Sequence, residues 1–344
     1  MASVAVVGAG VTGLVTAIEC ALAGHRVTVL DRGPVPNPAS TSSDQHRALR
    51  VLRPDDLEGT RRMAEARRRW LELESLLRTT LFRPVGVVTA GTPDELELAL
   101  DTAALAGLAA VTVSPETLAP VVFPAGTGGV HDVGAGVLLA DRFLCAAAGW
   151  LAAHPSVTLR PHCAVDGIDD HRVTLADGTA VGADLVLVAA GPWNTELVEQ
   201  PVVLYRQTMI YLHPPRDLAA WWASAPGVGR IGGGRTAWLL PPGEGTLLKI
   251  SSDVVCRQVA TTTEPDREPW ADRLLAEPIL AGAADYAVAA VRECHYAADP
   301  VDGGPILTRI RPSVWSRPAC GGSGFGTAPL VAREILGAVM EVSA

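Results

Sequence analysis

The feature that most constrains the fold is a glycine-rich turn between an apolar strand and an apolar helix near the start of the chain. Residues 4–7 are apolar and mostly β-branched, and Gly8-Ala9-Gly10-Val11-Thr12-Gly13 then opens an alanine-rich helical stretch that ends at Gly24. A second strand over residues 26–30 ends in Asp31. Such glycines allow a tight turn and close approach to a pyrophosphate, the helix N-terminus attracts that anion, and the acid suits ribose hydroxyls. The sequence therefore predicts a dinucleotide-binding βαβ unit.

Length and charge narrow the class of protein further. The chain has 344 residues, 48% of them hydrophobic, which predicts a large core and two domains. Its formal charge of -9 comes without an acidic tail or a basic cluster, which argues against nucleic acid or an anionic membrane as a partner. Since no long apolar run and no basic-then-apolar leader pattern is present, we expect a soluble, cytoplasmic protein, monomeric or a small homo-oligomer.

The cysteine and lysine positions are also informative. Six cysteines lie far apart without a CxxC pair, so we expect no metal site and no disulfide framework, and burial is the expected environment of the thiols. Of the 28 Lys and Arg residues only one is a lysine, Lys249. Lysine is a compact point charge, whereas arginine is a planar fork that keeps its proton. Position 249 is therefore expected to require a point charge.

The first half of the chain reads as alternating helices and strands after the βαβ unit. The patterns predict a helix over 56–78 with a solvated charged face, strands at 82–90 and 111–113, a helix at 93–105, and a loop entering a helix over 136–151.

The second half changes character. Strands near 157–159 and 172–175 and the segment before Gly191 predict a small three-stranded excursion from the main sheet. Longer strands at 208–212, 236–240 and 246–251 favour an antiparallel substrate domain, and a second glycine-rich loop then precedes a C-terminal helix.

Several separated segments together resemble one family. Besides the N-terminal unit, they are ALRVLR (48–53), GADLVLVAAGPWN (182–194), LYRQ (204–207), LLKISSD (247–253), ECHYAADP (293–300) and GGSGFG (321–326). In this order they resemble the D-amino-acid oxidase-like FAD-dependent oxidoreductases, and within them the monomeric sarcosine oxidase and N-methyltryptophan oxidase group. The resemblance covers nearly the whole chain.

The resemblance implies an α/β fold with two parts. The first is an FAD-binding Rossmann-like domain of the glutathione-reductase type, over residues 1–78, 136–200 and 297–344. The second is an α+β substrate domain with a large, mainly antiparallel sheet, over 79–135 and 201–296. The residues implied to bind FAD are Gly8, Gly10, Val11, Thr12, Gly13, Asp31, Arg32, Ser42, Ser43, Gly191, Trp193, Cys294, Gly321, Gly322, Ser323, Gly324 and Gly326.

The resemblance also implies the residues of the reaction site. Cys294 matches a cysteine that is thioether-linked to the 8α-methyl of FAD in the group, although an ordinary buried cysteine is the alternative. Lys249 matches a lysine whose charge promotes electron transfer to oxygen. Arg50 matches an arginine that binds the substrate carboxylate. His46 falls on a histidine close to the flavin, and Tyr296 on a tyrosine of the substrate pocket, with a core tyrosine as the alternative.

This chain departs from the group mainly where the substrate is expected. Ala328 replaces a second carboxylate-binding lysine, and Phe325 replaces a histidine. Asp253 stands in place of the histidine four residues after the oxygen-activating lysine, and Trp238 in place of a pocket tyrosine. We take Trp238, Asp253 and Phe325 as substrate-pocket residues, and they favour an amine that is larger, cationic or poor in carboxylate.

The function expected from these observations is an FAD-dependent amine oxidase. A secondary or primary amine, or an N-substituted amino acid, would be oxidised at its C–N bond to an imine, with oxygen as acceptor and hydrogen peroxide as product. Three alternatives remain at this point: a flavin dehydrogenase of the same fold with another acceptor, a nicotinamide enzyme, and a flavin-binding subunit without turnover.

Overall fold

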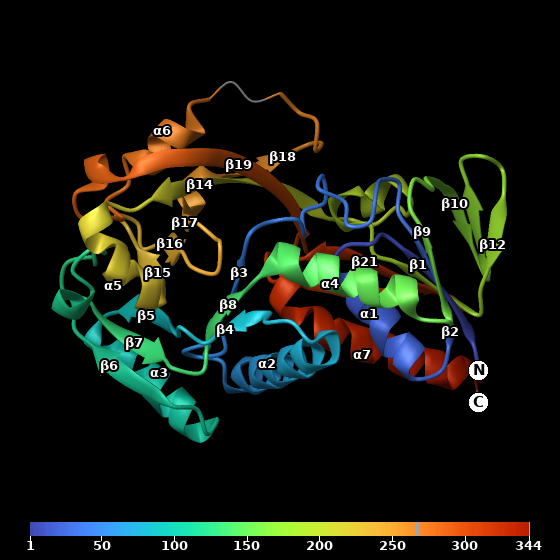
Figure 1. Cartoon of the computed structure of the whole chain (residues 1–344), viewed down its shortest axis with the longest axis horizontal. Coiled ribbons are helices and arrows are strands. Elements are labelled where there is room, and N and C mark those ends of the chain that lie inside the picture. Colours follow the sequence, from blue (N-terminus) through green and yellow to red (C-terminus); the bar gives the residue numbers. More distant parts are fainter. Residues whose placement is uncertain (266–267, 344) are drawn as a thin grey trace.

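Two large β-sheets lie side by side in the computed structural model, which describes residues 1–265 and 268–343 (Figure 1). Helices cover the six-stranded sheet, and a strongly curved larger sheet forms the other half. The architecture confirms the α/β class expected from the sequence.

The six-stranded sheet carries the dinucleotide-binding pattern. Its order is β20(Pro305–Arg311), β21(Val314–Cys320), β13(Leu185–Val188), β1(Ser3–Val7), β2(Arg26–Leu30) and β9(Val157–Arg160). All neighbours are parallel except β20 and β21. The central strands β1 and β13 are almost wholly buried, as expected for parallel strands with both faces covered.

Helices pack on this sheet and on one another. They are α1(Val11–Leu22), α2(Leu57–Leu77), α4(Ala140–Ala153) and α7(Gly324–Ser343). Helix α1 packs against α4 and α7, and α2 packs on the other side of α7 (Figure 1). Because α1 is enclosed by the sheet and two helices, its sequence is apolar on nearly every side.

The larger sheet is built around the long strand β14. Its path is β18(Cys256–Val259), β14(Val203–His213), β17(Leu248–Ser252), β16(Ala237–Leu240), β15(Gly227–Ile231), β5(Val87–Gly91), β7(Gly128–Asp132) and β6(Ala110–Val113), with β19(Ala287–Ala298) paired to β14. Its neighbours are antiparallel except β5 and β15. Helices α3(Pro93–Leu105), α5(Ala219–Ser224) and α6(Trp270–Leu275) belong to this half.

Two small sheets complete the described structure. One contains β3(Arg47–Leu49), β8(Gly136–Leu138) and β4(Phe82–Arg83), and the other contains β10(Val165–Asp169), β11(Arg172–Leu175) and β12(Ala180–Gly182). Short 3-10 turns lie at Pro115–Leu118, Gly191–Glu196, Arg216–Leu218, Asp253–Val255 and Ala283–Asp285.

Three local expectations were wrong. Residues 157–159 belong to β9 at the edge of the main sheet, because they pair in parallel with β2 and not with the excursion, which is β10–β12. The single strand expected over 82–90 is two strands, interrupted where Gly86 adopts a φ of +73°. The loop expected before α4 contains the strand β8. The domain boundaries stay a proposal, with β3–β8–β4 joining segments from both parts.

The caps explain where two helices begin. Asp56 accepts a hydrogen bond from the Gly59 N–H at 2.7 Å at the start of α2. Thr92 and Glu95 form a capping box at the start of α3, with Pro93 in its first turn. Both boundaries agree with the sequence expectation.

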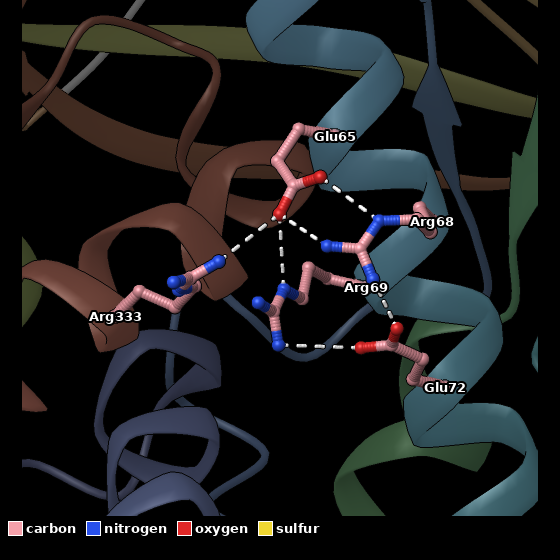
Figure 2. A network of polar contacts seen from close by, with 5 residues as sticks. All are labelled: Glu65, Arg68, Arg69, Glu72 and Arg333. Carbon is pink, nitrogen blue, oxygen red and sulfur yellow. Dashed lines mark hydrogen bonds and ion pairs between the residues drawn. The ribbon is translucent and has the colours of Figure 1, made fainter.

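The charged face of α2 is only partly solvated, because it carries an ion-pair network that reaches α7 (Figure 2). Glu65 accepts from Arg68 at 2.6 Å, from Arg69 at 3.1 Å and from Arg333 of α7 at 3.3 Å. Arg68 and Arg69 both pair with Glu72 as well. Hydrogen bonds from Arg68, with further help from Arg69, lower the pKa of Glu65 to about 2.

Glu65→Gln is expected to lower the free energy of unfolding by about 1 kcal/mol or less, since the pairs are partly exposed. Because the folded pKa lies below the ordinary value near 4.5, this contribution is present above pH 4.5 and is lost as the pH falls towards 2. Urea unfolding of wild type and variant across this range measures the effect. Glu97→Gln, an exposed acid of α3, is the control, and a pH-independent difference at Glu65 would contradict the prediction.

Candidate functional site

The glycine-rich turn holds two positions that no larger residue fits. Gly8 has a φ of +105°, and a Cβ there would lie 2.4 Å from the Ala189 carbonyl oxygen. A Cβ on Gly13 would lie 1.9 Å from the Gly8 oxygen. The start of α1 therefore packs directly against the turn, which leaves Gly10 and Val11 beside a cavity.

Asp31 closes the turn from the end of β2. Its Oδ2 accepts from the Ala9 N–H at 2.9 Å, and its Oδ1 accepts from the Gly33 N–H at 2.8 Å and from Asn37 at 2.9 Å. These contacts fix the carboxylate at the cavity wall, where it retains lone pairs for a ribose hydroxyl.

Ser42 and Arg32 are held at the same cavity. Ser42 Oγ accepts from the Val11 N–H at the start of α1 at 2.9 Å. The Arg32 guanidinium lies 4.4 Å from the centroid of the Trp193 ring. Ser43 instead donates to Asp141 at 3.2 Å and lines a neighbouring hollow.

The cavity has a volume of about 380 Å³ and extends to where β19 reaches the six-stranded sheet. Of the residues expected to bind FAD, it brings together Gly8, Gly10, Val11, Thr12, Asp31, Arg32, Ser42, Gly191, Trp193, Cys294, Gly322 and Gly324. A turn that a Cβ would fill, a helix N-terminus and an acid after β2 fit the phosphates and ribose of a dinucleotide. The cavity continues from this turn to β19, where Cys294 and Tyr296 line it.

The remaining glycine-loop residues have structural contacts. A Cβ on Gly321 would lie 2.7 Å from the Gly304 carbonyl carbon. Ser323 donates to the Cys320 carbonyl at 3.1 Å, and the Gly326 carbonyl accepts from Trp70 at 3.0 Å. Together with Gly13, these residues shape the loop and do not line the cavity.

Cys294 lies on β19, is unpaired and lines the cavity. Burial raises the pKa of its thiol, an effect that Arg47 and Lys249 oppose. The general expectation of buried thiols is confirmed only for Cys20. Cys145 is exposed because it lies on the face of α4 turned away from the core, and the other four thiols are partly buried. Cys163 and Cys320 also line the cavity.

Lys249 is 1% exposed and lies on β17, directly across from Tyr211 of β14. Its Nζ donates to Asp44 Oδ2 at 2.5 Å and to the His46 carbonyl at 3.3 Å. The ring of Trp238 on the next strand is centred 5.6 Å from Nζ. Burial lowers the pKa of Lys249 well below its ordinary range, and Arg47 adds to this effect.

His46 is fully buried, and neither ring nitrogen forms a hydrogen bond of normal geometry. Burial, with Lys249 and Arg83 nearby, lowers the pKa of His46 to about 3, although the Leu240 and Pro241 carbonyls oppose the shift. The imidazole is therefore neutral near pH 7 and contributes no charge beside Lys249.

Arg50 and Asp253 form a second group of opposite charges. Both side chains are accessible to water. Burial lowers the pKa of Arg50 and raises that of Asp253, and each charge opposes the shift of the other. The Arg50 guanidinium runs beside β15, where a Cβ on Gly229 would lie 3.6 Å from it. Among the described residues, none forms a hydrogen bond or ion pair with this guanidinium.

Tyr296 connects this group to the cavity. Its ring stacks on Tyr205 with centroids 5.3 Å apart, and its hydroxyl lies 3.4 Å from Cys256 Sγ. Burial raises the pKa of Tyr296, and the neighbouring Asp253 raises it further. Tyr296 also lines the cavity.

Phe325 lies apart from the other expected pocket residues. It is 7% exposed and stacks on Trp70 at 5.5 Å, with Phe143 edge-on at 6.0 Å. It reaches the cavity wall, whereas Trp238 and Asp253 do not line that cavity. Ala328 lies within α7 and is fully buried in the core.

The sequence reasoning missed three residues of the site: Asp44, Arg47 and Tyr211. Asp44 binds Lys249, Arg47 and Tyr211 together. No sequence pattern around Asp44 indicates a functional role. The only available signal is indirect: a buried lysine requires an anionic partner, and Asp44 is that partner.

Residues 1–265 and 268–343 contain no group of three His, Cys, Asp or Glu side chains arranged to hold a metal ion. None of their helices combines the length and apolarity needed to span a membrane.

Comparisons with known proteins support the cofactor assignment. The family model described as FAD dependent oxidoreductase (DAO) matches residues 3–336. Peroxisomal sarcosine oxidase of Mus musculus is 27% identical over 226 residues, which cover 60% of this chain and 56% of that protein. The chain thus matches little more than half the length of this relative.

Solved structures share the fold. Fructosamine oxidase (Amadoriase II) of Aspergillus fumigatus has a TM-score of 0.79 at 21% identity, covering 99% of this chain and 87% of that one. A variant of NikD, an amino acid oxidase of nikkomycin biosynthesis, has a TM-score of 0.80 at 20% identity, covering 100% and 95%. At such identities the likeness shows the fold alone.

These findings confirm the resemblance seen in the sequence and exclude the nicotinamide alternative, since the matching family uses FAD. The family model spans both sheets and the whole cavity. The chain therefore belongs to the DAO family of FAD-dependent oxidoreductases.

Proposed function

We propose that this chain is an amine oxidase. A secondary or primary amine, or an N-substituted amino acid, loses a hydride from the carbon next to nitrogen and a proton from nitrogen, and the imine is then hydrolysed. Oxygen takes the two electrons and two protons and leaves as hydrogen peroxide. The observation that carries the proposal is that Cys294 and Tyr296 line the cavity, while the buried ammonium of Lys249 lies near enough to Cys294 for their charges to interact.

The protein's own residues bind and orient. Bound FAD supplies the two-electron acceptor. The glycine turn, α1 and Asp31 fit its phosphates and ribose, and Cys294 and Gly322 fit the flavin end. Lys249 provides a fixed positive charge in a site without bulk water, where it stabilises the anion formed as oxygen accepts an electron.

Arg50 and Asp253 favour a substrate with groups of both signs. Arg50 has a free guanidinium for a carboxylate, and Asp253 suits a cationic group. Tyr296 supplies aromatic surface at the cavity wall, and the Trp238 ring lies beside the Lys249 ammonium. Position 328 offers no second cation, since Ala328 is enclosed in the core, which favours an amine other than a simple N-methylglycine.

The direct test is anaerobic mixing of the purified yellow protein with a panel of amines, followed by air. Amines with and without a carboxylate, and with a second cationic group, form the panel. Bleaching of the flavin band, recovery in air and stoichiometric peroxide are expected. Bleaching without recovery would favour a dehydrogenase, and a flavin that no amine bleaches would favour a binding subunit. Cytoplasmic location and a monomeric or small homo-oligomeric state stay predictions from the sequence.

We also propose that Cys294 Sγ is joined to the flavin as a thioether. With FAD bound, such a link would take one proton from the Cys294 thiol and one from the flavin methyl, and oxygen would take up the two electrons released. After acid precipitation, colour should stay in the pellet of wild type and leave with the supernatant in Cys294→Ala. Cys320→Ala, which removes another thiol of the same cavity, should behave like wild type. A colourless wild-type pellet would contradict the link.

A further inference from the structure

Asp44 is the anion at the centre of a buried polar cluster. It is 1% exposed, and its Oδ2 accepts from Lys249 at 2.5 Å and pairs with Arg47. Its Oδ1 accepts from the Tyr211 hydroxyl at 2.6 Å and from the Gln45 N–H at 2.7 Å. Four donors therefore converge on one carboxylate.

The position of Asp44 is fixed from outside the cluster. Its own N–H donates to Asp141 Oδ1 at 2.8 Å, in the first turn of α4. Ser43 binds the same oxygen. The carboxylate thus reaches Lys249 from a loop anchored to a helix, 205 residues away in sequence.

The surroundings of Lys249 otherwise oppose a charge. Burial is the largest effect, and Arg47 and Arg292 are like charges. The titratable groups that face Lys249 are Asp44 and His46 of the loop, Arg47 of β3, Asp141 of α4, Tyr211 of β14, and Arg292 and Cys294 of β19. His46 is neutral, so Asp44 is the carboxylate that makes direct contact with the ammonium.

We propose that Asp44 is the counter-ion that keeps Lys249 protonated and fixed beside Cys294, and that it thereby sets the pH range in which the enzyme passes electrons to oxygen. Asp44 is a positioning residue, because it acts through Lys249. The oxygen part of the inference rests on the proposed function, whereas the pairing with Lys249 does not.

The chain permits a direct test, because Lys249 is its only lysine. Biosynthetic labelling with lysine that carries carbon-13 at Cε gives one side-chain NMR signal in the FAD-loaded protein, and its shift reports the protonation of Nζ. In wild type we expect a charged lysine throughout the neutral range. In Asp44→Asn its pKa should fall by about one to three units, the usual effect of one adjacent opposite charge.

Two variants serve as controls. Asp44→Glu retains the anion and should restore most of the wild-type titration, which a merely structural role would not predict. Asp166→Asn removes an exposed acid far from the cluster and should leave the signal unchanged. A neutral lysine in folded wild type at pH 7, or the same titration in wild type and Asp44→Asn, would overturn the inference. The first of these outcomes needs no variant to fold.

Reoxidation of the reduced flavin across the same pH range tests the consequence. A lysine with a lower pKa loses its charge at a lower pH. The rate of flavin reoxidation in Asp44→Asn should therefore fall at a lower pH than in wild type, and at neutral pH it should be about 10- to 100-fold slower. If the pKa of Lys249 falls in Asp44→Asn but the rate of reoxidation does not change, the role in oxygen reduction is overturned. The pairing of Asp44 with Lys249 would still hold. A wild type that oxygen never reoxidises would instead refute the proposed oxidase function.

Discussion

Replacing Lys249 by methionine is expected to slow reoxidation of the reduced flavin by oxygen about 100- to 1,000-fold. The ammonium is 1% exposed, so no water replaces it as a stabiliser of the anion formed from oxygen. Stopped-flow mixing of the reduced protein with oxygen measures the rate. Reduction of the flavin by amine under anaerobic conditions should change little, since the role proposed for Lys249 lies in the oxygen half of the cycle.

The single variant leaves Asp44 buried beside Arg47 without its ammonium partner, which destabilises by about 3–5 kcal/mol in comparable buried pairs. Lys249→Met combined with Asp44→Asn removes both charges and separates lost stability from lost reactivity. Lys249→Arg keeps the charge in a bulkier planar group and should retain part of the rate. If the amine and oxygen half-reactions slow equally, Lys249 positions the whole site and the oxygen role is wrong.

Gly13→Ala is expected to release FAD. The new Cβ would lie 1.9 Å from the Gly8 oxygen, so α1 must move away from the turn that we propose receives the phosphates. Overpacking of this kind destabilises by about 1–3 kcal/mol. If this whole free-energy cost applies only to the protein with FAD bound, the affinity for FAD falls by about 5- to 150-fold.

The measurement is the flavin-to-protein ratio after gel filtration, in a Cys294→Ala background so that a covalent link cannot mask weaker binding. Gly149→Ala is the matched control, because Gly149 is exposed within α4 and a Cβ there meets nothing within 4 Å. That change should stabilise by about 0.5–1 kcal/mol. An unchanged flavin ratio in Gly13→Ala would mean that the turn does not hold the phosphates.

The local sequence pattern is sufficient to predict an element whose start and end are set by its own residues. The glycine turn, the capped helix α3 and the C-terminal helix after Gly322 all follow from residues within one or two turns of chain. Strand β9 was misassigned because its partner is chosen by the sheet and not by its own four residues. The break at Gly86 was missed for a related reason, since it depends on how β4 and β5 join different sheets.

The residues of the site also fall into two groups, those with a signal in the local sequence and those that depend on distant contacts. Lys249 stood out because of composition, and Cys294 because of its neighbours in sequence. Asp44 has no such mark, because its importance arises from a contact with a residue 205 positions away. Phe325 was expected in the pocket from its place in the glycine loop, but the direction of its ring depends on the Trp70 and Phe143 surfaces that enclose it.

The buried Lys249 has a further consequence for chemical labelling. The folded chain offers no side-chain amine to solvent, because its one lysine is enclosed with Asp44. Amine-directed cross-linkers and acylating reagents have no side-chain target on its surface. Acylation of Lys249 requires the ion pair with Asp44 to separate and the sheet around β17 to open. The rate of acylation therefore depends on how often this part of the structure opens. Mass spectrometry of the intact protein can follow this single modification, and its rate measures local opening around Lys249.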